Sequence, residues 1–147
     1  MTLVQKSNRL PAGVLAIAGL FAVGVLASGA SCLALLFPES ALSNVWCLNP
    51  QAGTELRALG WPAVALMTAV CVACALACSG LLRRRVSGYW TALALLAFNG
   101  MSDLVAAIAR ADPRTLIGVP IAIALILYLR QGRIAGLFVA IPRKLGD

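Results

Sequence analysis

The sequence of 147 residues contains no histidine and only 5 acidic residues. Without imidazole, the chain cannot supply an axial histidine to haem, a histidine ligand to a metal, or the base of a Ser-His-Asp triad. Several common kinds of catalytic and metal chemistry are therefore excluded within this chain.

Charged residues are scarce, at 12 %, whereas apolar residues make up 61 % of the chain. A soluble domain has about a quarter of its residues charged, and a chain of this length could not bury so much apolar surface in water. Lipid is therefore the expected solvent, and the length fits one domain, residues 1–147. The net charge of +7 does not indicate nucleic acid, because the basic residues stand at the ends of apolar runs.

Four apolar runs are long enough to cross a membrane, at about residues 11–37, 61–82, 88–110 and 113–130. The sequence thus predicts an all-α membrane protein, a four-transmembrane-helix antiparallel bundle. A cleaved signal peptide is the competing interpretation of the first run, and we favour an uncleaved helix. Gly118 and Pro120 predict a kink in the first half of the fourth helix.

Residues 38–60 form the longest connection between these runs. Asn49 followed by Pro50 is a helix-start signal and Gly60 a stop signal, which predicts a short interfacial helix in the first outer loop. The basic tail is too short to span again, and we expect its apolar residues to lie along the membrane surface; these are Ile134, Leu137, Phe138 and Ile141.

The distribution of basic residues predicts that both termini are cytoplasmic, in a multi-pass protein of the bacterial inner (plasma) membrane. This N-in/C-in orientation places nine basic residues inside and three outside, in agreement with the positive-inside rule. The inner set is Lys6, Arg9, Arg83, Arg84, Arg85, Arg130, Arg133, Arg143 and Lys144, and the outer set is Arg57, Arg110 and Arg114.

The third run contains an intramembrane polar site formed by Asn99, Ser102 and Asp103. Asn99 and Asp103 share one helix face, and an acid in hydrocarbon should face protein or a water-filled cavity. Asp103 could be a proton relay, a cation ligand or the wall of a cavity. The alternative, which we favour, is a structural carboxylate bonded to Asn99, Ser102, Thr68 or one of the outer arginines. Those arginines are Arg57, Arg110 and Arg114.

Cys71, Cys74 and Cys78 form one stripe of the second run. A fourth ligand is missing and three thiolates in hydrocarbon would be costly, so we expect no metal and no cofactor, and interpret the cysteines as small packing residues. A disulfide between Cys32 and Cys47 is an open alternative. Small residues four apart in the first run favour close helix packing, within the chain or with another subunit; they are Ala18, Ala22, Gly24 and Ser28.

Several local motifs occur together: WCLNP at 46–50, GYW at 88–90, Asn99-xxx-Asp103, DPRTLIGVPI at 112–121 and Tyr128-Leu129. With these motifs the chain resembles uncharacterised small four-helix integral membrane proteins of bacteria, over about residues 9–138. The resemblance implies the four-span topology and transfers no activity to any residue.

The function predicted from the sequence is that of a non-enzymatic membrane protein, a structural, accessory or lipid-contacting four-helix module. Its expected partners are the lipid bilayer, whose headgroups would contact Arg83, Arg84 and Arg85, and another membrane subunit or a second copy. The alternative is a small transporter or channel subunit that uses Asp103 and Asn99 in an oligomer. A membrane enzyme acting on lipid or quinone is less attractive, because few catalytic groups remain.

Overall fold

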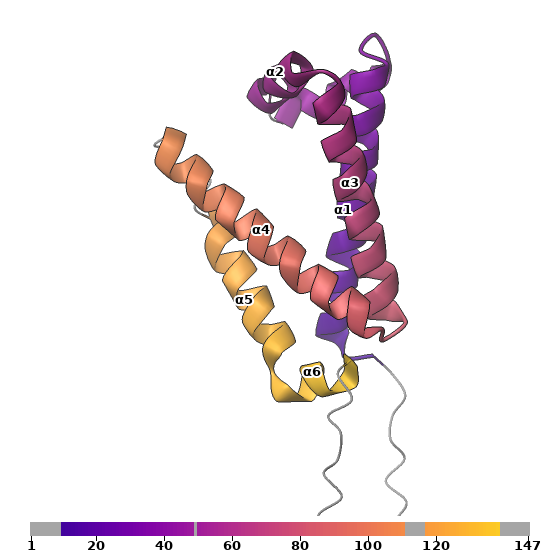
Figure 1. Cartoon of the computed structure of the whole chain (residues 1–147), viewed down its shortest axis with the longest axis vertical. Coiled ribbons are helices and arrows are strands. Elements are labelled where there is room, and N and C mark those ends of the chain that lie inside the picture. The colour runs from indigo at the N-terminus through magenta and orange to yellow at the C-terminus, as the bar shows by residue number, and fades with distance from the viewer. Residues whose placement is uncertain (1–9, 49, 111–116, 139–147) are drawn as a thin grey trace, which may run out of the picture.

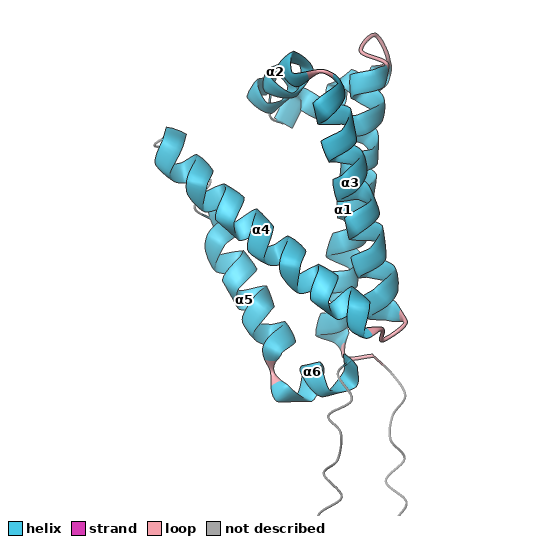
Figure 2. Cartoon of the chain, in the orientation of Figure 1, coloured by secondary structure: helices cyan, strands magenta, loops and turns pink. Residues whose placement is uncertain are grey.

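The computed structural model describes residues 10–48, 50–110 and 117–138, which are helical apart from short turns, with no strand among them (Figures 1 and 2). The helices are α1 (Ala12–Leu36), the 3-10 helix η1 (Ala41–Leu48), α2 (Pro50–Leu59), α3 (Trp61–Leu82), α4 (Val86–Arg110), α5 (Gly118–Arg130) and α6 (Gly132–Phe138).

Three of the described helices, α1, α3 and α4, are long and apolar enough to cross a membrane. The number becomes four if α5 and α6, which are bent by 69° at their junction, count as one span. The expectation of an all-helical chain with several apolar spans is confirmed, and the helices are consistent with a multi-pass membrane protein. In addition, α2 occupies the range predicted for a short helix in the first loop, whereas η1 was not predicted.

α1 and α3 pack closely because small residues line their shared seam. Gly24 and Ser28 of α1 lie four residues apart on one helix face, and Ser28 is buried, as is Ala18 nearer the start of the helix. A Cβ added at Gly24 would lie 3.2 Å from the Cys74 sulfur on α3, so the seam has little spare room. The Ser28 hydroxyl donates to the Gly24 carbonyl at 2.7 Å and leaves no unpaired donor there. Ala22, by contrast, is exposed.

A tight turn joins α3 to α4. The Arg85 N–H donates to the Gly80 carbonyl at 2.8 Å, and Arg84 adopts a positive φ of 54°, an uncommon conformation for a residue with a side chain. This turn starts α4 at Val86, two residues before the expected start. It also presses Gly80 against Gly88, where a Cβ on either residue would overlap the backbone of the other.

Beyond this contact the two helices diverge. Figure 1 shows the α4–α5 pair and the α1–α3 pair as the two arms of a V, with the α3–α4 turn and α6 near its apex. The buried core lies at that end, formed by the start of α1, the end of α3, the start of α4, the end of α5, and α6. The described helices therefore do not pack as a closed bundle along their whole length: α3 and α4 touch at Gly80 and Gly88 beside the turn and diverge farther along (Figure 1).

The C-terminal helix differs from the expectation of a segment lying on the membrane surface. Ile134 and Phe138 of α6 are buried in the core, and the Phe138 ring stacks on Tyr89 with centroids 5.4 Å apart. The predicted kink cannot be followed along the whole fourth run, since residues 111–116 lie outside the described part. Within that part α5 begins at Gly118, so Pro120 stands in the first turn. No helical hydrogen bond is lost there, because N–H groups of the first turn have no acceptor within the helix.

Candidate functional site

Two adjacent faces of α4 differ in what they contact. One face turns toward the buried core and α5, and it contains Leu96, Gly100, Asp103 and Ala107. A Cβ added at Gly100 would lie 3.1 Å from the Ala122 Cβ of α5. This face is buried or half-buried. The neighbouring face contains the other two polar residues predicted from the sequence, Asn99 and Ser102, and both are exposed.

The Asp103 carboxylate occupies the space that a side chain at position 118 would need. A Cβ added at Gly118 of α5 would overlap Asp103 Oδ2 and lie 2.8 Å from its Cγ. The acid is therefore half-buried between α4 and α5. No described residue forms a hydrogen bond or an ion pair with it.

The partners expected for the acid are thus not assembled around it in the described part. The Thr68 hydroxyl donates to the Val64 carbonyl at 2.8 Å and lies 3.5 Å from the Cys32 sulfur. Arg57 lines a groove between α1, α2 and α3. The side chain of Arg110, and all of Arg114, lie outside the described residues. The structure instead places Gly118 of α5 directly against the acid, a contact that the sequence does not predict because no local pattern shows which glycine faces an acid.

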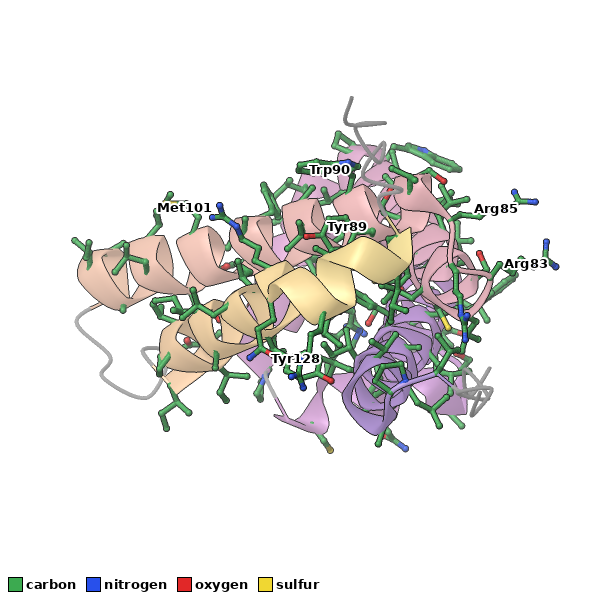
Figure 3. All side chains as sticks on the ribbon, turned by 90° about the horizontal axis from the view of Figure 1, so that it is seen from below. Arg83, Arg85, Tyr89, Trp90, Met101 and Tyr128 are labelled. Carbon is green, nitrogen blue, oxygen red and sulfur yellow. The ribbon has the colours of Figure 1, made fainter. Side chains whose placement is uncertain are left out.

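The face of α4 that contains Asn99 and Ser102 has the spacing of a helix-packing seam. Leu95, Asn99, Ser102, Ala106 and Ala109 recur at intervals of four and three residues, as side chains do along a coiled-coil contact. Leu95 packs against the core and Ala106 is half-buried, whereas Asn99, Ser102 and Ala109 are exposed. Beside the seam lies a shallow groove of about 490 Å³, and its six lining residues, among them Ser102 and Met101, all belong to α4. In Figure 3 Met101 lies on the side of α4 away from α5.

The basic turn at 83–85 is largely exposed. Arg83 and Arg85 are exposed and point outward in Figure 3, whereas Arg84 is half-buried. Trp90, near this end, is 61 % exposed, and Trp61, at the far end of α3, is 78 % exposed. Exposed tryptophans near both ends of the apolar helices are typical of membrane interfaces.

The cysteines contribute to packing. Cys71 donates its S–H to the Val25 carbonyl of α1 at 3.6 Å, and Cys74 is buried against Gly24. Among the described residues, no group of three His, Cys, Asp or Glu side chains could hold a metal ion. Cys32 and Cys47 are both free thiols, so the structure contains no disulfide between them.

Comparisons with family models, with curated proteins and with solved structures gave no match. The function has to be inferred from the chain itself.

Proposed function

We propose that the protein is a non-enzymatic, four-span accessory protein of the bacterial inner membrane, and that its role is to hold another transmembrane segment against the polar face of α4. The observation that carries the proposal is the exposure of Asn99 and Ser102 in the middle of an apolar helix.

An amide exposed to hydrocarbon is costly, because neither its donors nor its acceptor can pair with lipid tails. Interhelical hydrogen bonds between polar side chains in membranes contribute about 0.6–2 kcal/mol each. A partner helix that paired with Asn99 and Ser102 would therefore be bound specifically. Ala106 and Ala109, next along the same face, are small and would let that helix approach closely.

The position of the acid supports an accessory role. Asp103 turns toward α5 and packs on Gly118, within the chain's own helix pair. A proton relay also needs further carboxylates or basic groups at depth, and the described parts of α1, α3 and α5 between their end residues contain no Asp, Glu, Lys, Arg or His.

The separation of charges supports the four-span, N-in/C-in orientation. The turn at 83–85 and the α5–α6 junction with Arg130 and Arg133 lie at one end of the molecule, and α2 with Arg57 lies at the other (Figure 1). In this orientation the exposed arginines at 83 and 85 face the cytoplasmic headgroups, where each basic residue contributes about 1 kcal/mol of attraction to anionic lipid.

A second candidate is a subunit of a transporter or channel. The same exposure of Asn99 and Ser102 favours it, because polar residues on the outside of one chain can line a path only when several chains surround that path.

Photo-crosslinking tests the accessory role. A photoreactive amino acid at position 102 should give adducts with a protein in intact membranes, because a partner helix covers this face. The matched control is position 26 on α1, where Leu26 is 72 % exposed and should contact lipid alone. Lipid adducts alone at position 102 would count against the proposal, and adducts only between copies of this chain would favour the oligomeric transporter.

A further inference from the structure

The groove that contains Arg57 lies at the end of the α1–α3 pair opposite the basic turn. It measures about 430 Å³ and is formed where α1 ends, α2 crosses and α3 begins. Its lining is mainly apolar, with Leu35, Leu56 and Val64 among its walls, and Arg57 is its only charged residue. Arg57 is exposed, in the last turn of α2.

The groove lies at the depth of lipid headgroups. α1 has 25 residues, so it is about 38 Å long at 1.5 Å per residue, longer than the hydrocarbon thickness of about 30 Å. The ends of α1 and α3 therefore reach the polar region of the bilayer. Trp61, which lines the groove and is 78 % exposed, has the chemistry and exposure of an interfacial anchor.

From this arrangement we infer that the groove binds one anionic phospholipid, with its phosphate on Arg57 and an acyl chain along the apolar wall of α1 and α3. A guanidinium can donate two parallel hydrogen bonds to a phosphate, and it stays protonated at every physiological pH. A phospholipid has a charged headgroup and apolar acyl chains. The groove offers one cation for the headgroup and, next to it, an apolar wall for an acyl chain.

This inference does not depend on the proposed role of α4, which lies on a different helix. It also differs from general attraction to the basic turn, since Arg57 lies at the opposite end of the α1–α3 pair and lines an apolar groove.

The full chain is mixed in detergent with either phosphatidylglycerol or phosphatidylcholine. Native mass spectrometry, which strips the detergent in the gas phase, then counts the lipid molecules that stay bound to the protein. The wild type should retain one phosphatidylglycerol more strongly than phosphatidylcholine. Arg57→Gln should weaken that retention about tenfold or more, because a charge-assisted hydrogen bond is lost. Arg133→Gln removes the same charge from an exposed site on α6 and should leave retention unchanged.

Two further arms separate a phospholipid site from its alternatives. Val64→Phe keeps Arg57 and fills the apolar wall, so it should also weaken retention; circular dichroism checks that each variant is still helical. An excess of inorganic phosphate should not displace the lipid, since phosphate cannot use the apolar wall. Displacement by phosphate would show that the site binds a free anion instead. Equal retention of both lipids, unaffected by Arg57→Gln, would show that the protein binds only nonspecific annular lipid. Either outcome overturns the inference.

Discussion

Replacing Gly80 with alanine should lower the free energy of unfolding, because the two arms of the V meet there through backbone. A Cβ at Gly80 would overlap the Cα of Gly88 and lie 2.9 Å from its N and 3.6 Å from its C. Non-bonded heavy atoms pack best at about 3.5–4.0 Å, so α3 and α4 would have to separate by about 1 Å or more beside a three-residue turn that resists it.

The magnitude follows from two opposing effects. Overpacking costs about 1–3 kcal/mol, whereas alanine in place of glycine inside a helix gains up to about 1 kcal/mol. The net expectation is a loss of about 1–2 kcal/mol. Gly19→Ala in α1 is the matched control: nothing lies within 4 Å of its added Cβ, so only the gain in helix propensity applies.

The assay is unfolding in mixed micelles of increasing SDS content, followed by tryptophan fluorescence and far-UV circular dichroism. Wild type, Gly80→Ala and Gly19→Ala are measured side by side. If Gly80→Ala proves as stable as Gly19→Ala, the close contact of α3 and α4 and the V built upon it are refuted.

Three further predictions use the same protein. Gly118→Ala should cost about 1–3 kcal/mol, since its methyl overlaps the Asp103 carboxylate, and adding Asp103→Ala should recover most of that loss in a double-mutant cycle by SDS unfolding. Changing Cys71, Cys74 and Cys78 together to alanine should leave the fold intact, at about 1 kcal/mol or less per sulfur; loss of a bound metal or chromophore in elemental analysis or the absorption spectrum would contradict the packing role. In intact cells a membrane-impermeant thiol reagent should label Cys47 and leave Cys71, Cys74 and Cys78 unmodified, whereas protection of Cys47 with labelling of Arg85→Cys would reverse the orientation.

The helix boundaries could be predicted where local signals are strong. The observed α3, Trp61–Leu82, coincides with the expected range because Gly60 takes a positive φ before Pro62 and the basic turn follows Leu82. In the same way Pro50 begins α2. These ends depend on proline, glycine and charge, which act locally and are visible in the sequence.

The arrangement of the helices could not be predicted in the same way. Periodicity predicts that Asn99 and Asp103 share a face, but in the structure Asn99 is exposed and Asp103 is half-buried beside Gly118, and this difference depends on where α5 lies. Likewise, an apolar tail residue such as Phe138 suits a lipid surface and a protein core equally well, and its place in the core depends on tertiary contacts such as that with Tyr89. The close approach of α3 and α4 at the apex of the V depends on a contact between two glycines, which carry no pattern of their own.

The central claim, that another transmembrane segment covers the polar face of α4, is tested most directly by the mass of the particle that contains this chain. The chain is extracted from its native membrane into polymer nanodiscs without detergent, and its complex is weighed by native mass spectrometry. The wild type should appear in a protein complex whose mass exceeds its own 15.2 kDa and is not a whole-number multiple of it, and the double change Asn99→Leu and Ser102→Leu should release it as a monomer. The control, Val72→Leu with Leu76→Val on the exposed side of α3, should keep the complex. A wild type that is already monomeric, or a complex unchanged by the leucines at 99 and 102, would contradict the claim.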